Sequence, residues 1–177
     1  MANKAEKAKE LGEQYEKRCT GCAQTTLAAV MDALGTQSED AFRAASGLAD
    51  GVGLSGDGSC GALTGGAMAI GLLRGRPRKD FNDPLAAMDS YLLARQLVRH
   101  FQERYGSCRC YDIQKKLMGR TFNLLDPKEM GEALEFGMLE HCSGVVGDSA
   151  KKTVELLVEQ GDAAGPGKEG RRPASGR

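Results

Sequence analysis

The sequence predicts an all-α fold, a single bundle of about six to eight helices with short connections. Apolar residues recur at three- and four-residue spacing along most of the 177 residues, and no stretch shows the sustained period-two alternation of a strand. Asp-Pro pairs at 83–84 and 126–127 and glycines such as Gly35 mark helix boundaries. The length suits one domain, which we place at residues 1–160.

The first helices follow from local signals. Residues 2–18 predict a polar helix, rich in lysine and glutamate, whose charged side chains form a solvated face. The run at residues 19–22 interrupts it, and a second helix of apolar period continues to a stop at Gly35. Ser38 then predicts the N-cap of a short helix through Ala45.

A glycine-rich loop follows, with eight glycines in residues 47–66. Such a segment lets backbone approach a neighbouring group closely. The pattern G-x-G-x-x-G occurs there twice, starting at Gly51 and at Gly56. We reject a dinucleotide-binding loop as the primary reading, because that motif follows a β-strand and the residues before Gly51 are helix-like.

Capping residues also mark the starts of the next two helices. Ser59 predicts the cap of a helix from Cys60 to about Arg74, followed by a solvated basic loop. Asp83-Pro84 predicts the start of the longest helix, with Tyr91 on its core face.

Three more helices follow along the chain. Gly106 ends the long helix, and short helices are expected over 111–118 and from Asp126-Pro127 to about Phe136. A last helix follows the tripeptide at 141–143 and ends at Gly161. We expect the tail, residues 161–177, to be disordered.

Charge and composition exclude several function classes. Twenty-four cations balance 24 acids and aromatics make up only 5% of the chain, so neither a basic field nor a stacking surface for nucleic acid is expected. No apolar run reaches the length of a membrane span. The first residues alternate lysine and glutamate where a secretory signal is apolar, and we therefore expect a cytoplasmic protein.

Cysteine is the informative residue type. The chain has six cysteines, which include a C-x-x-C and a C-x-C: Cys19, Cys22, Cys60, Cys108, Cys110 and Cys142. In a reducing compartment such residues serve metal ligation or redox chemistry more often than disulfides. A single free cysteine is also an ordinary core residue.

Four of these cysteines share a predicted placement at or just before a helix N-terminus: Cys22, Cys60, Cys110 and Cys142. The free N–H groups and partial positive charge there stabilise a thiolate and lower a cysteine pKa. Cysteine in place of serine or threonine near a cap is the alternative explanation. The four lie far apart in sequence, so only tertiary packing can gather them.

The same residues resemble a known family. Cys22-Ala23-Gln24, the hexapeptide C-G-A-L-T-G at 60–65, Gly106-Ser107 followed by Cys110, and a last Cys142 are similar to redox-active proteins named for a C…GCAxxG…C…C pattern. The resemblance covers roughly residues 10–160. Similar domains occur in split-Soret cytochromes, which implies a cysteine-ligated iron–sulfur site in a helical fold and an electron-handling role.

Carried over, the four family cysteines are Cys22, Cys60, Cys110 and Cys142. Cys19 and Cys108 are additional to the pattern, so the choice between Cys108 and Cys110 as ligand stays open. Covalent heme c is unsupported, because the C-x-x-C at 19–22 is followed by Ala23 and not by histidine.

Three functions are compatible with these residues. The first is electron transfer by an iron–sulfur cluster, expected to be 2Fe-2S, on the four family cysteines. The second is metal-free thiol–disulfide chemistry at the Cys19/Cys22 pair, and the third is a structural zinc site. His100 is expected at the surface or half-buried, and His141 as a partly exposed loop residue. No catalytic residue is assigned, the redox partner protein is unidentified, and a homodimer is left open.

Overall fold

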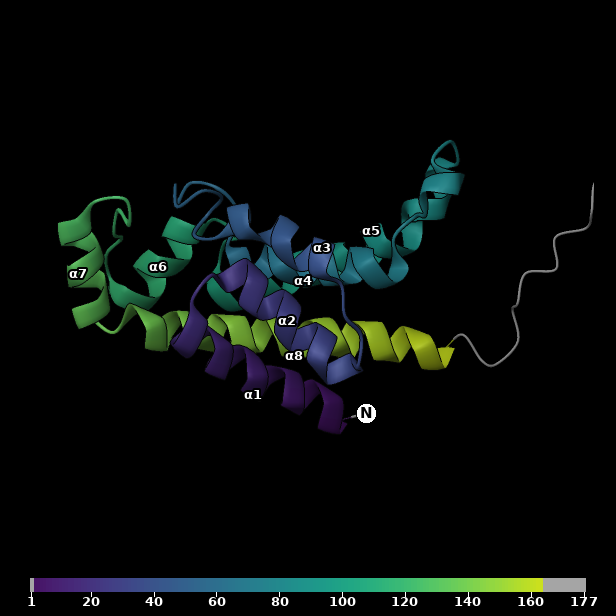
Figure 1. Cartoon of the computed structure of the whole chain (residues 1–177), viewed down its shortest axis with the longest axis horizontal. Coiled ribbons are helices and arrows are strands. Elements are labelled where there is room, and N and C mark those ends of the chain that lie inside the picture. The colour runs from purple at the N-terminus through teal and green to yellow at the C-terminus, as the bar shows by residue number, and fades with distance from the viewer. Residues whose placement is uncertain (1, 164–177) are drawn as a thin grey trace, which may run out of the picture.

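The computed structural model describes residues 2–163 and confirms the all-α prediction (Figure 1). The described residues form eight α-helices and three short 3-10 helices. Their β-structure is confined to an isolated antiparallel bridge between Ser59 and Arg109. No helix in this part of the chain combines the length and apolar character needed to cross a membrane.

The α-helices are α1 Ala2–Cys19, α2 Cys22–Leu34, α3 Glu39–Ala44, α4 Gly61–Arg74, α5 Met88–Tyr105, α6 Cys110–Met118, α7 Pro127–Glu135 and α8 Met138–Ala163. The 3-10 helices are Ala45–Leu48, Arg78–Asp80 and Pro84–Ala87.

The helices pack around α8. Helix α1 lies along α8 and α2, and α2 also packs on α4, which in turn contacts α5 and α8 (Figure 1). Leu27, Ile70, Leu97 and Phe101 are fully buried in the core that these helices share. Helices α6 and α7 lie at one end of the bundle (Figure 1).

A second, smaller apolar cluster holds that end together. Its buried members are Met118, Phe122, Ala133 and Met138, contributed by α6, the following loop, α7 and the start of α8. Because this cluster is separate from the main core, α7 depends on it for its position.

Several predicted boundaries are confirmed by their capping geometry. The Ser38 side chain accepts a hydrogen bond from the Ala41 N–H at 3.3 Å, as an N-cap does. The Asp126 carboxylate accepts one from the Lys128 N–H at 2.8 Å, and Pro127 occupies the first turn of α7. Gly35 ends α2 in the left-handed conformation.

The prediction that the longest helix begins at Asp83 is wrong in its start and in its relative length. Asp83 caps the 3-10 turn Pro84–Ala87, α5 begins only at Met88, and α8 with 26 residues is the longest helix. Tyr91 is 58% exposed, not in the core. The core face of α5 is set by Leu93 and Leu97, and at 100° per residue Tyr91 points roughly the opposite way from Leu93.

Two further helix boundaries differ from those predicted by the sequence. Ser59 does not cap α4; it joins the bridge to Arg109, and Cys60 takes the N-cap position. Helix α8 does not stop at Gly161 but continues to Ala163. The rest of the predicted tail lies outside the described residues.

The charged side chains of residues 2–18 were expected to form a solvated face, and Glu16 is an exception to this prediction. Only 5% of Glu16 is exposed, and its carboxylate accepts a hydrogen bond from the Thr25 hydroxyl at 2.6 Å. The cause is the packing of α1 on α2, which encloses the last turn of α1.

Candidate four-cysteine site

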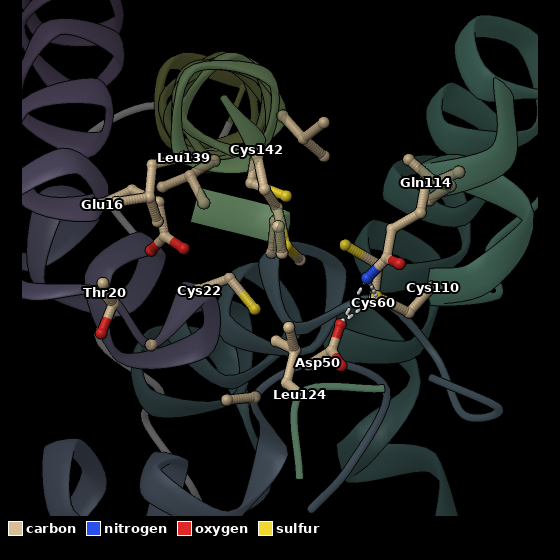
Figure 2. A pocket seen from close by; sticks show the side chains of 18 of the residues that line it. Glu16, Thr20, Cys22, Asp50, Cys60, Cys110, Gln114, Leu124, Leu139 and Cys142 are labelled. Atoms are coloured by element: carbon tan, nitrogen blue, oxygen red, sulfur yellow. Dashed lines mark hydrogen bonds between the residues drawn. The ribbon is translucent and has the colours of Figure 1, made fainter. Parts of the chain in front are cut away.

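One cavity of about 390 Å³ brings the four predicted cysteines together. Its lining includes Cys22 from α2, Cys60 from the start of α4, Cys110 from α6 and Cys142 from α8 (Figure 2). The four elements meet at the end of the bundle near α6 and α7. The predicted gathering of distant cysteines by tertiary packing is therefore present in the fold.

Three of the four cysteines lie at helix N-termini as predicted. Cys22 is the first residue of α2, Cys60 is the N-cap of α4 and Cys110 is the first residue of α6. The prediction is wrong for Cys142, because α8 begins at Met138 and Cys142 lies in its second turn. Its side chain still faces the cavity (Figure 2).

The C-G-A-x-x-G hexapeptide has a packing role at each small residue. A β-carbon on Gly61 would overlap the Cys22 sulfur, so glycine leaves the room that this thiol occupies. Ala62 is fully buried, and its carbonyl accepts a hydrogen bond from the Ser149 hydroxyl at 2.7 Å. A β-carbon on Gly65 would overlap the Ala23 carbonyl, so this glycine lets α4 approach α2 closely.

The glycine-rich loop before α4 is wound in an unusual direction. Every residue of the run 50–54 has positive φ, including the non-glycine residues Asp50 at 46°, Val52 at 70° and Leu54 at 60°. A residue with a side chain loses on the order of 1–2 kcal/mol of conformational energy in this left-handed region of φ. The loop is therefore strained, and surrounding contacts must hold it.

Backbone hydrogen bonds fasten this loop to the segment that leads into α6. The Cys110 N–H donates to the Gly58 carbonyl at 3.0 Å, and the Tyr111 N–H donates to Gly56 at 2.9 Å. The Cys60 N–H donates to the Cys108 carbonyl at 2.8 Å. These bonds fix the relative positions of Cys60 and Cys110 although 49 residues separate them in the sequence.

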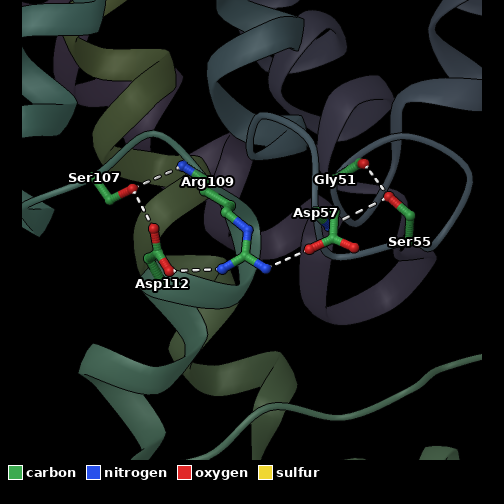
Figure 3. A network of polar contacts seen from close by, with 6 residues as sticks. All are labelled: Gly51, Ser55, Asp57, Ser107, Arg109 and Asp112. Carbon is green, nitrogen blue, oxygen red and sulfur yellow. Dashed lines mark hydrogen bonds and ion pairs between the residues drawn. The ribbon is translucent and has the colours of Figure 1, made fainter.

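A surface network adds to this attachment (Figure 3). The Arg109 guanidinium bridges Asp57 in the loop and Asp112 in α6, the latter at 2.9 Å. The Ser107 hydroxyl donates to Asp112 at 2.8 Å and accepts from the Arg109 N–H at 3.0 Å. Each exposed ion pair contributes at most about 1 kcal/mol, so the backbone bonds dominate.

Asp50 is a site residue that sequence reasoning missed. One carboxylate oxygen accepts hydrogen bonds from the Gln114 amide at 2.7 Å and from the Cys110 thiol at 3.0 Å, while the other is buried and has no hydrogen-bond partner among residues 2–163 (Figure 2). Burial raises the pKa of Asp50, and the two hydrogen bonds oppose that rise. An aspartate among loop glycines carries no sequence signal that separates it from a turn residue.

The four thiols do not share one electrostatic environment. The neighbouring Cys110 thiol lowers the pKa of Cys60, and the N–H groups of Ala62 and Leu63 in the first turn of α4 add to this effect. Hydrogen bonding to Cys60, followed by burial, raises the pKa of Cys110. Cys60 is therefore the first of this pair to ionise.

Burial is the main influence on the pKa of the other two thiols. Cys22 and Cys142 are half-buried as whole residues, but their side chains face the cavity and not bulk water. Desolvation consequently raises the pKa of both, and the charge of Cys60 adds to the rise. Among these four cysteines the pKa is lowered at Cys60, where the hydrogen bond with Cys110 is the largest cause and the N–H groups at the start of α4 contribute less.

The two additional cysteines lie outside the cavity lining. Cys19 is exposed at the end of α1, and the half-buried Cys108 donates a weak hydrogen bond to the Val98 carbonyl at 3.8 Å. All six cysteines are free thiols. Of the two neighbours left open by the sequence, Cys110 faces the cavity and Cys108 does not.

Neither histidine lies at the cysteine site. His100 is half-buried, as expected, and pairs with Asp148 at 2.8 Å, where the Tyr105 hydroxyl also donates at 2.9 Å. His141 is exposed but lies within α8 and not in a loop. Neither side chain lines the cavity.

The four cysteine side chains face one cavity (Figure 2). Within residues 2–163, no three Cys, His, Asp or Glu side chains stand close enough together to hold one metal ion.

Comparison with known proteins identifies the family. Residues 20–156 match the family model described as "Putative redox-active protein (C_GCAxxG_C_C)", and this span contains all four cysteines that line the cavity. No similar protein was found among curated proteins, and no similar chain among solved structures. The match covers most of the chain, which therefore belongs to the C_GCAxxG_C_C family of redox-active proteins.

Proposed function

We propose that this protein transfers electrons by means of an iron–sulfur cluster held by Cys22, Cys60, Cys110 and Cys142. The observation that carries the proposal is that four thiols, from four separate elements, line one cavity. Four cysteine thiolates are the usual ligand set of both two-iron and four-iron clusters. We keep 2Fe-2S as the expected type.

The surroundings of the cysteines fit such an occupant. The cavity is far larger than one ion, its walls are mainly apolar, and Gly61 leaves room beside the Cys22 sulfur. When bound, a cluster supplies reversible one-electron transfer, with a potential set by hydrogen bonds to the sulfurs and by solvent exposure.

The chain's own residues would then hold and tune the ligands. The Gln114 amide lies 3.6 Å from the Cys110 sulfur and can donate a hydrogen bond to it as a thiolate. The first-turn N–H groups of α4 stabilise negative charge on Cys60. Asp50 orients Gln114 through their 2.7 Å hydrogen bond.

Purification without oxygen tests the proposal directly. We expect a brown protein with a broad visible absorption band and with iron and acid-labile sulfide in equal amounts. Two of each per chain would establish the 2Fe-2S type, and four the larger cluster. Zinc without sulfide would support a structural metal site, and colourless metal-free protein would leave the thiol–disulfide function.

Cysteine variants test which sulfurs are ligands. We expect Cys60→Ser to lose the colour and the sulfide, because Cys60 lines the cavity and is the most easily ionised of its pair. Cys108→Ser and Cys19→Ser are matched controls outside the lining, and both should keep most of the colour. Equal loss in all three variants would contradict the ligand assignment.

Metal-free thiol chemistry is the second candidate. The pairing of a Cys60 thiol of lowered pKa with the neighbouring Cys110 favours it, since a thiolate beside a thiol is the arrangement of a dithiol redox couple. The Cys19/Cys22 pair is less suited to this role, because Cys19 is exposed whereas Cys22 faces the cavity. The redox partner protein and any homodimer stay predictions.

A further inference from the structure

The cavity has a second part that cysteine ligation does not use. Besides the four thiols, its lining includes apolar side chains from the segment 117–139, among them Leu124, Met130, Leu134 and Met138. This segment comprises the end of α6, a loop, α7 and the start of α8. The side chains of this segment that line the cavity are leucine, methionine and alanine, so the four-cysteine ligand set does not account for their presence.

The apolar part opens to solvent beside α7. Leu134 is 55% exposed and Met130 is 41% exposed, although both line the cavity. Apolar side chains that are both exposed and part of a cavity wall mark its mouth. A molecule entering there would reach the cysteines without passing through the main core.

Charge restricts what can enter. Among the described residues that line the cavity are the acids Glu16 and Asp50, but no lysine, arginine or histidine. An anion moved from water into such a site would find no cation to offset its lost hydration. Nucleotides, phosphate esters and carboxylates are therefore disfavoured, whereas an uncharged apolar molecule is suited to these walls.

Size and wall composition agree with a small-molecule site. Ligand cavities are commonly about 300–1,000 Å³, with mainly apolar walls and few polar groups. The whole cavity, which includes the space beside the four cysteines, has a volume of about 390 Å³ and falls in this range. Met118, Met130 and Met138 give the wall unbranched thioether side chains that can adapt to differently shaped ligands.

We propose that the part of the cavity beneath α7 binds a small, uncharged, largely apolar molecule next to the four cysteines. Binding itself needs no cluster.

Two dyes that share one skeleton test the proposal. N-phenyl-1-naphthylamine is neutral, and 8-anilino-1-naphthalenesulfonate adds one sulfonate to the same rings. We expect the protein purified without oxygen to bind the neutral dye at one site per chain, at least tenfold more tightly than the sulfonate. Ultrafiltration measures both affinities without interference from a coloured cofactor.

Variants locate the site. Leu134→Trp fills the mouth and should weaken binding of the neutral dye at least fivefold. Leu85→Trp is the matched control, because Leu85 is 74% exposed and lies outside the cavity lining. Met130→Lys places a cation at the mouth and should shift the affinity ratio of the two dyes at least fivefold toward the sulfonate.

The outcomes separate this inference from the proposed function. Absence of neutral-dye binding, equal binding of both dyes, or insensitivity to Leu134→Trp would overturn the inference even in a brown protein. An unchanged dye ratio in Met130→Lys would also overturn it. Selective dye binding to colourless, iron-free protein would support the site and reject the cluster.

Discussion

Gly61 stands where two cysteines approach each other, the N-cap Cys60 of α4 and the first residue of α2, Cys22. We expect Gly61→Ala to cost about 1–3 kcal/mol of unfolding free energy, because its β-carbon would overlap the Cys22 sulfur and force a shift. Gly71→Ala on the same helix meets no atom within 4 Å and should stabilise the protein by about 0.5–1 kcal/mol. Urea denaturation of both variants measures the difference, and equal effects would contradict the close approach.

Glu16 makes a prediction about pH. Burial raises its pKa in the folded protein, so folding takes up protons, and stability from this residue is full below the unfolded pKa and declines as pH rises through the folded pKa. Glu16→Gln keeps an acceptor for Thr25 without the charge. In cluster-free protein we expect the variant to match the wild type near pH 4 and to exceed its stability increasingly toward pH 8.

The measurement for Glu16 is the difference between variant and wild-type unfolding free energies across pH. Glu13→Gln is a control on the same helix, with its side chain more than one-third exposed. A pH-independent difference for Glu16 would show that its carboxyl titrates alike in the folded and unfolded chain.

At the scale of residues, the sequence predicted that four cysteines meet, and they do line one cavity, but it did not predict the buried acids around them. A cysteine is rare and its chemistry limited, so its type alone indicates a site. Glu16 follows a helix pattern full of exposed charge, and only the packing of α1 on α2 buries it. Asp50 is buried because its loop winds through the left-handed region.

At the scale of elements, the glycine-rich loop is the part on which the site most depends. Gly56 and Gly53 both have positive φ, at 68° and 62°, but only a β-carbon on Gly56 would enter the Tyr111 ring. We expect Gly53→Ala to cost about 1–2 kcal/mol from backbone strain alone. Gly56→Ala should cost more and also reduce cofactor content, since it separates the loop from α6.

A double variant distinguishes the causes. Removing the ring in Gly56→Ala/Tyr111→Ala should recover most of the cofactor lost in Gly56→Ala, because only the strain of the alanine then remains. Thermal unfolding and iron content report the two effects. Equal losses in the Gly53 and Gly56 single variants would assign the whole cost to backbone conformation.

Element boundaries were predictable where a local signal fixes them. Ser38, Asp126-Pro127 and Gly35 act through neighbouring backbone groups, and all three mark true helix ends. Ser59 and Asp83 also have side-chain oxygens that can cap a helix, but neither caps the α-helix that the sequence predicted for it. Ser59 pairs with Arg109, which is 50 residues away, and Asp83 caps a 3-10 turn before α5.

At the scale of the whole molecule, the site lies between two apolar cores. Cys60 belongs to the main core, with Cys22 packed against it, whereas Cys142 packs on the small cluster around Phe122. The sequence predicted that helix ends would gather the sulfurs, but not that a second cluster would complete the enclosure. Short amphipathic segments such as 127–135 do not reveal which core they join.

The separate small cluster makes α7 the part of the site most ready to open. Only Ala133 of α7 is buried, while Ile70 and Leu97 anchor α4 and α5 in the main core. Local opening of α7 therefore exposes little apolar area and should cost less free energy than opening α4. By hydrogen–deuterium exchange, we expect the amides of 130–136 to exchange at least tenfold faster than those of 66–72. Saturating N-phenyl-1-naphthylamine should slow exchange in 130–136 and leave 66–72 unchanged, because the dye would contact the inner face of α7. Equal protection of the two segments without dye would instead mean that α7 opens only when the whole bundle unfolds.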